Sequence, residues 1–240
     1  MPCMASPLMR KCCVRELGRM EYAQAVELQR QLVDERKQGL IPDQLLMLEH
    51  PHVVTLGRNG RMENLLAGDE ILRRAGISFY ATDRGGDATY HGPGQLVGYP
   101  ICDLRGWKRD VEAYVRAIEQ AIIDTLADFG VAAGRISKLT GVWVGERKIA
   151  AIGVHISRWV TSHGFALNVN TDLNYFHYIV PCGLAKPVTS MARLGVRAAL
   201  PEISRILAGH FGRVFNYEML PAAPAEPVNA TWFSHDQTPA

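Results

Sequence analysis

Val142-Trp-Val-Gly-Glu-Arg-Lys-Ile-Ala150 holds two short β-prone runs on either side of a polar turn at residues 145–147. A glycine followed by polar residues between two such runs predicts a β-hairpin, with Lys148 at the start of the returning strand. Similar β-prone runs predict further strands, so the expected set covers residues 45–49, 53–56, 77–81, 96–101, 142–144, 149–156 and 165–169.

Three other segments show the spacing of amphipathic helices. Apolar residues recur at helical spacing from Tyr22 to Val33, and a second helix is predicted from the capping residue Asp110 to Phe129. A third covers residues 203–215. Strands joined mostly by short turns, with helices inserted between groups of strands, predict an α+β or α/β domain with a mixed β-sheet.

Length and composition fit one globular domain. We expect one domain at residues 16–220, since 48% of the 240 residues are hydrophobic and 21% charged. Tails are expected at 1–15, which begins without a periodic pattern, and at 221–240, which is rich in proline, alanine and polar residues. A net charge of +2 indicates neither a nucleic-acid nor a membrane partner. The chain shows no apolar run of about 18 residues and no continuous apolar signal core, so a cytoplasmic location is expected.

The five cysteines are odd in number and show no C-x-x-C spacing, which predicts free thiols. Cys102 continues an apolar run and is expected in the core, while Cys12 and Cys13 lie near the expected tail. The two histidines of His50-Pro-His52 lack further spaced ligands, so they indicate a turn, and no metal site is predicted.

Cys182 stands between a proline and a glycine, where exposure of the side chain is easy. A free cysteine is more often an inert apolar residue, and an ordinary cysteine pKa of about 8.5 leaves little thiolate at neutral pH. A nucleophile here therefore needs a nearby cation or base, for which Lys148, His91 and His163 are the candidates. A lysine beside a hairpin turn is usually solvated, but burial next to Cys182 would let Lys148 exchange protons near neutrality.

A glycine-rich segment, Arg84-Gly-Gly-Asp-Ala-Thr-Tyr-His-Gly-Pro-Gly-Gln95, follows one expected strand and precedes another. It is too rich in glycine to be an ordinary strand, so we expect it to be a binding loop. Glycines let the backbone approach a ligand and present its N–H groups, and Arg84 and His91 add polar anchors. The same composition also fits a turn-rich connection. The segment matches neither the phosphate-binding loop nor the dinucleotide-binding fingerprint, so phosphate binding is not the default.

Four motifs taken together resemble the octanoyltransferases of lipoate biosynthesis, also called lipoyl(octanoyl) transferases. They are the glycine-rich segment 84–95, Lys148-Ile-Ala-Ala-Ile-Gly153, His163-Gly-Phe-Ala-Leu-Asn168, and Pro181-Cys-Gly183 with Val188-Thr-Ser-Met191. The match extends from about Glu16 to Phe215 in the family's order. The resemblance implies the fold of the biotin and lipoate protein ligase catalytic domains, a mixed β-sheet flanked by helices.

The resemblance also implies the chemistry of an acyltransferase without a cofactor. Such enzymes take octanoate from octanoyl-acyl carrier protein and deliver it to a lysine of a lipoyl domain, in a 2-oxoacid dehydrogenase subunit or the glycine-cleavage H protein. It makes Cys182 the acyl-thioester nucleophile and Lys148 the residue that lowers its pKa. It places the substrate pocket at Arg84, Gly85, Gly86, Asp87, Ala88, Thr89, Tyr90, His91, Ala151, Ile152, Gly153, Gly164, Phe165 and Ala166.

Two other functions remain as alternatives. An ATP-dependent lipoate protein ligase shares the fold but makes an acyl-adenylate, which needs no cysteine nucleophile. A non-catalytic domain that docks carrier proteins would turn over no acyl substrate. Lys148 together with Pro181-Cys-Gly183 favours the transferase, because the ligase needs no cysteine nucleophile. Exchange between thioesters is nearly isoenergetic and transfer to an amine is downhill, so the transferase needs no nucleotide.

Overall fold

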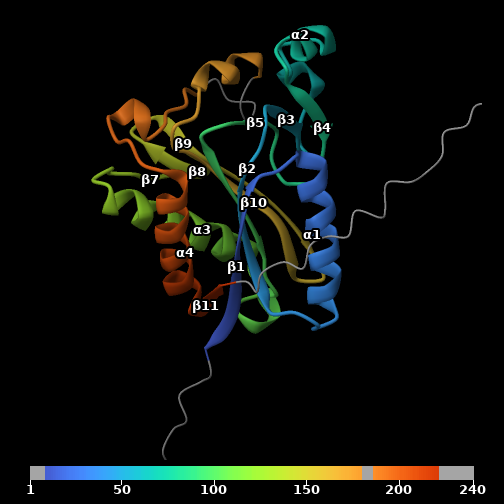
Figure 1. The fold of residues 1–240 in the computed structure, drawn as a ribbon, viewed down its shortest axis with the longest axis vertical. Coiled ribbons are helices and arrows are strands. Elements are labelled where there is room, and N and C mark those ends of the chain that lie inside the picture. The colour runs from blue at the N-terminus through green and yellow to red at the C-terminus, as the bar shows by residue number, and fades with distance from the viewer. Residues whose placement is uncertain (1–8, 180–185, 222–240) are drawn as a thin grey trace, which may run out of the picture.

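The computed structural model describes residues 9–179 and 186–221. An eight-stranded mixed sheet of order β11-β1-β2-β6-β10-β9-β8-β7 forms the centre of the fold, with a three-stranded sheet of order β4-β3-β5 at one end (Figure 1). The strands are β1 (Arg10–Arg19), β2 (Asp43–Glu49), β3 (Val53–Leu56), β4 (Ser78–Ala81), β5 (Ala88–His91), β6 (Gln95–Ile101), β7 (Gly134–Ile136), β8 (Leu139–Val144), β9 (Arg147–Ser157), β10 (Val160–Asn168) and β11 (Tyr217–Pro221). The helices are α1 (Tyr22–Lys37), α2 (Asp69–Arg74), α3 (Val111–Asp128) and α4 (Leu200–Phe215).

Helices cover both faces of the large sheet (Figure 1). Along β2, Leu45 and Met47 belong to the core cluster that includes α3 and α4, whereas Leu46 and Leu48 pack with α1 on the other face. Successive side chains of a strand point to opposite faces, so a strand buried on both faces is apolar throughout. The predicted mixed sheet flanked by helices is confirmed.

The predicted helices and hairpin form as expected. Asp110 caps α3 by accepting a hydrogen bond from the backbone N–H of Ala113 at 2.9 Å. The turn between β8 and β9 contains Gly145 with φ of 57°, and Lys148 is the second residue of β9, paired with Trp143. The left-handed backbone at residue 145 explains why a glycine is needed there.

Two expectations about local structure were wrong. Residues 10–15, predicted as tail, lie in β1, which pairs in parallel with both β2 and β11 and buries Cys12 completely. Residues 88–91 of the glycine-rich segment form the regular strand β5, which pairs with β3. In the described part of the chain, no helix is both long and apolar enough to cross a membrane.

Candidate active site

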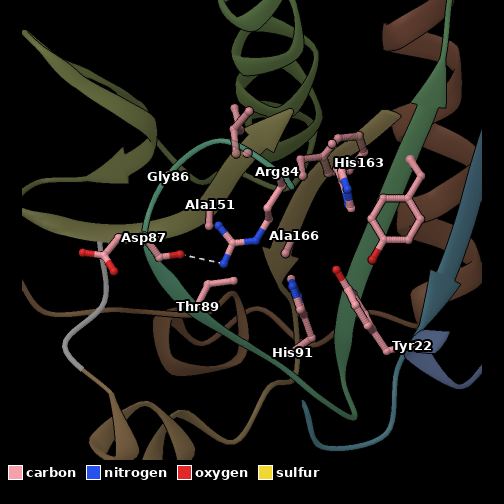
Figure 2. Close-up of a pocket in the computed structure, with 14 residues that line it drawn as sticks. Tyr22, Arg84, Gly86, Asp87, Thr89, His91, Ala151, His163 and Ala166 are labelled. Carbon is pink, nitrogen blue, oxygen red and sulfur yellow. Dashed lines mark hydrogen bonds between the residues drawn. The ribbon is translucent and has the colours of Figure 1, made fainter. Parts of the chain in front are cut away.

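A narrow cavity lies between the glycine-rich segment and strands β9 and β10 (Figure 2). The cavity itself has a volume of about 40 Å³. The empty space between atoms around it amounts to about 460 Å³ and is partly open to solvent. The structure brings eleven of the fourteen expected pocket residues to its wall: Arg84, Gly86, Asp87, Thr89, His91, Ala151, Ile152, Gly153, Gly164, Phe165 and Ala166. Tyr22, Tyr99 and His163 line it as well. Gly85, Ala88 and Tyr90 are not part of its lining.

Two cross-strand pairs of small residues form the sheet side of the cavity. Ala151 faces Ala166 and Gly153 faces Gly164 in the antiparallel ladder of β9 and β10. Residues two apart on a strand share a face, so the four lie together as a flat, apolar trough. Figure 2 shows Ala151 and Ala166 at the cavity beside the Arg84 side chain. Such a surface suits an unbranched alkyl chain.

The two glycines of this trough are also required by close backbone approaches. A Cβ on Gly153 would lie 2.6 Å from the carbonyl oxygen of Gly85, and one on Gly164 would overlap with that of Gly98. A larger residue at position 153 would therefore displace the glycine-rich segment rather than only shorten the cavity. Variants of the two alanines are the cleaner probes of the space available.

Arg84 holds the glycine-rich segment against β3. Its guanidinium donates to the hydroxyl and the carbonyl of Thr55 and to the carbonyls of Gly85 and Asp87, at 2.6–3.1 Å. The fork of N–H donors matches this set of oxygens, which a lysine ammonium could not reach together. Although Arg84 lines the cavity, these bonds show that it braces the loop. Asp87 braces it too, since its carboxylate accepts from the backbone N–H groups of Arg61 and Ala88.

A group of histidines and tyrosines forms the opposite wall of the cavity. Tyr22, at the start of α1, stacks on His91, and Figure 2 shows both rings projecting toward the cavity. Burial lowers the pKa of His91 to about 3, and the nearby His50 and Arg84 add to this. Sequence reasoning missed Tyr22 and Tyr99, because one belongs to an apolar helix stripe and the other to an apolar strand.

His163 reaches the cavity from a left-handed backbone position on β10, with φ of 55°. Its Nε2–H donates to the carboxylate of Asp83 at 2.8 Å. Burial lowers the pKa of His163, and the bond to Asp83 opposes that effect. The side chain is thus committed to Asp83 at one edge of the cavity.

Lys148 is buried on β9, with 9% of its surface exposed. Its ammonium lies 4.8 Å from the centre of the Trp143 ring, and its backbone exchanges hydrogen bonds with Pro187 and Thr189 at 2.9 Å. The chain around residues 187–189 therefore runs beside Lys148. Cys182, the expected nucleophile, lies outside the described residues, as do Pro181 and Gly183. The solvated-lysine alternative is excluded by the burial of this side chain.

Two other thiols are unsuited to nucleophilic chemistry. Cys12 and Cys102 are completely buried, and burial raises the pKa of each thiol far above its ordinary value.

His50, proposed above as part of a turn, donates from Nδ1 to the carbonyl of Met20 and bonds through Nε2 to the hydroxyl of Tyr99. The residues that the structure describes contain no cluster of three or more potential metal ligands.

Known proteins match the chain along most of its length. The model of the lipoyl protein ligase A/B catalytic domain matches residues 21–212. An octanoyltransferase of Solibacter usitatus is 74% identical over 215 residues, which are 90% of this chain and 98% of that protein. One of Koribacter versatilis is 52% identical over 86% of this chain and 85% of its own length.

Solved structures support the fold. A crystal structure of lipoate-protein ligase A bound with ATP aligns with a TM-score of 0.74 over 91% of this chain and 90% of that chain, at 18% identity. A biotin protein ligase from Aquifex aeolicus aligns with a TM-score of 0.51 at 10% identity, over 85% of this chain and 70% of its own. At these identities the likeness concerns the fold alone, whereas the sequence relatives establish the family. The chain belongs to the octanoyltransferase family and is built on the lipoyl protein ligase A/B catalytic domain.

Proposed function

We propose that this octanoyltransferase takes octanoate from octanoyl-acyl carrier protein as a thioester on Cys182 and delivers it to the lysine of a lipoyl domain. The observation that supports this proposal most is the buried Lys148, whose backbone pairs with residues 187–189 only a few positions after Cys182. A buried cation near a thiol favours the thiolate. Lipoyl domains of 2-oxoacid dehydrogenase subunits and the glycine-cleavage H protein are the proposed acceptors, and no cofactor takes part. The cytoplasmic location stays a prediction.

The first half-reaction loads the enzyme. Lys148 favours the thiolate of Cys182, which attacks the carbonyl carbon of the octanoyl thioester. The tetrahedral oxyanion then collapses, the bond to the pantetheine sulfur breaks, and the leaving thiolate takes a proton from the Lys148 ammonium, which becomes a neutral amine. One thioester replaces another, so no nucleotide is consumed. The trough at Ala151, Gly153, Gly164 and Ala166 would hold the alkyl chain meanwhile.

The second half-reaction delivers the acyl group. The neutral amine of the acceptor lysine attacks the carbonyl carbon of the thioester, and the carbon–sulfur bond to Cys182 breaks as the amide forms. The nitrogen loses one proton, which the neutral Lys148 amine left by the first half-reaction is proposed to accept, so that the ammonium is restored beside the Cys182 thiolate. An amide is more stable than a thioester, so this step is downhill.

The fold is shared with ATP-dependent ligases, so ATP dependence separates the two functions. The purified chain is mixed with octanoyl-acyl carrier protein, then with a lipoyl domain, without ATP, and the intact mass of each protein is followed. We expect one octanoyl group to appear first on the chain and then on the lipoyl domain. Modification of the lipoyl domain only by free octanoate with ATP would establish the ligase instead.

A further inference from the structure

Gln95, at the start of β6, connects the cavity wall to the segment beside Lys148. Its Oε1 lies 2.8 Å from Nδ1 of His91, and its Nε2 donates to the side-chain oxygen of Asn168 at 2.9 Å and to the carbonyl of Tyr90 at 3.2 Å. The side-chain amide of Asn168 in turn donates to the carbonyl of Thr189 at 3.0 Å. The three polar side chains are all buried.

Two backbone carbonyls, which can only accept hydrogen bonds, fix which atom donates in each hydrogen bond from Asn168 to His91. The carbonyl of Thr189 requires the NH₂ group of Asn168, so the other atom of that amide is an oxygen and must accept from Gln95. The carbonyl of Tyr90 independently requires the NH₂ group of Gln95. The oxygen of Gln95 therefore faces His91, and Nδ1 of His91 must carry the proton that this oxygen accepts.

The other ring nitrogen of His91 is consequently a bare acceptor. A neutral imidazole that is protonated on Nδ1 has a lone pair on Nε2. Among the described residues none hydrogen bonds to this Nε2, and the ring lines the cavity (Figure 2). The cavity thus offers an acceptor whose complement is a hydrogen-bond donor on the substrate.

We propose that Gln95 and Asn168 are positioning residues that fix His91 in its Nδ1–H form, so that Nε2 accepts a hydrogen bond from the amine of the incoming lysine. This assignment of the donor rests on the proposed function. The octanoyl chain has no donor, and the carbonyl and sulfur of a thioester only accept. The amide N–H groups of the pantetheine arm would act in the loading step, which the two half-reactions separate from transfer. The neutral lysine amine can donate one N–H while its lone pair stays free to attack the carbonyl carbon.

The surroundings of His91 make it a hydrogen-bond acceptor rather than a base that takes up a proton. The groups that face it are Tyr22 from α1, His50 after β2, Arg84 from the glycine-rich segment and His163 from β10. Burial above all, and then His50, Arg84 and His163, lower the pKa of His91 to about 3, although the bond to Gln95 opposes this. A ring with so low a pKa is neutral at working pH and is a weak proton acceptor.

The same hydrogen bonds connect His91 to the strand that carries Lys148. The carbonyl of Thr189 receives the bond from Asn168, and its backbone N–H donates to the carbonyl of Lys148 at 2.9 Å. Two side chains and one backbone residue therefore connect the His91 ring to Lys148.

Nitrogen NMR tests the positioning directly. In the full chain with ¹⁵N-labelled histidine, the His91 ring is assigned by its loss in His91→Gln and read from ring proton–nitrogen correlations between pH 5 and 8. We expect Nδ1 protonated and Nε2 unprotonated throughout. Gln95→Met should raise the Nε2–H population, whereas the control Gln31→Met, on the exposed face of α1, should leave it unchanged. A ring protonated on Nε2 in the parent chain overturns the positioning role.

The two half-reactions test the assignment of the donor. Acylation of Gln95→Met by octanoyl-acyl carrier protein should keep the parent rate, while transfer of octanoyl from that adduct to a lipoyl domain should slow about tenfold. Equal slowing of both steps, or of neither, overturns the amine assignment. If the parent chain forms no octanoyl adduct at all, the proposed function fails, and the tautomer measurement still decides the role of Gln95.

Discussion

The ammonium of Lys148 lies over the ring of Trp143, and its side chain passes beside Gly141. A Cβ at position 141 would lie 3.4 Å from Cε of Lys148 and 2.7 Å from the carbonyl oxygen of Ala150, so this glycine leaves room for the lysine and its strand. A cation over an indole face is stabilised by about 0.5–2 kcal/mol. Trp143 and Gly141 together fix the direction in which Lys148 extends.

Lys148→Arg separates two roles of this lysine. Arginine keeps a positive charge that favours the thiolate of Cys182, but its pKa above about 12 prevents it from losing and regaining a proton. We expect Lys148→Arg to keep part of the reactivity of Cys182 toward an alkylating reagent and to lose most octanoyl transfer. Lys148→Ala should lose both.

Circular dichroism and thermal melts establish that both Lys148 variants fold, since the arginine head is larger and the site is buried. If a folded Lys148→Arg transfers octanoate at nearly the parent rate, Lys148 acts only through its charge. The group that moves the proton would then be another residue, with His163 the first to test because His91 has too low a pKa.

Ala151→Leu should shorten the acyl chain that the enzyme accepts. Its side chain lies beside Ala166 in the trough, and a leucine there occupies space that the end of an octanoyl chain would use. We expect the preference for octanoyl over butanoyl carrier protein to fall about tenfold or more, the effect of about two buried methylenes. The control Ala127→Leu is exposed on α3. An unchanged chain-length profile in Ala151→Leu would count against this placement of the acyl chain.

Arg84→Lys tests the brace between the glycine-rich segment and β3. Lysine keeps the charge but cannot donate to Thr55, Gly85 and Asp87 together, so the free energy of unfolding should fall by about 2–3 kcal/mol. Transfer should fall with it, because the segment lines the cavity. Arg73→Lys, an exposed control on α2, should change stability by less than about 0.5 kcal/mol. Equal stability of the two variants in urea denaturation would contradict the brace.

His50 should make stability depend on pH. Burial lowers its pKa from 6.5 to about 4 in the native chain, although the bond to Met20 opposes this. The unfolded chain therefore binds a proton that the native chain excludes, and stability falls as the pH drops from 6.5 toward 4, by about 1.4 kcal/mol per pH unit. His50→Asn should reduce the slope of unfolding free energy by about this amount between pH 5 and 6. An identical slope would show that His50 is not held neutral.

Local patterns predicted most of the fold, and distant pairings account for what they missed. The helices α1, α3 and α4 follow from the periodicity of their apolar residues, and α3 also from its cap Asp110, all of which are encoded within each segment. Strand β1 has only a weak alternation of apolar and polar residues, as in Arg10-Lys-Cys-Cys-Val14. It is formed by pairing with β2 and β11. No short window contains those partners.

The motifs predicted the cavity, but not which of their residues face it. Thr89 and His91 line the cavity, while Ala88 and Tyr90 alternate with them on β5 and pack into the core of the small sheet. Because this segment was interpreted as a loop, the alternation of its side chains was not predicted. Tyr22 and Tyr99 reach the cavity through tertiary packing alone, so their own segments carry no signal of it.

The covalent intermediate is proposed on Cys182, and mass mapping of the acyl-enzyme identifies the residue that carries the octanoyl group. The chain is loaded with octanoyl-acyl carrier protein, separated from it at low pH, digested, and its peptides are sequenced by mass spectrometry. We expect one octanoyl group on Cys182 that hydroxylamine removes, and no adduct or transfer in Cys182→Ala. An octanoyl group on Cys13, Cys12 or Cys102, or full transfer by Cys182→Ala, would contradict it.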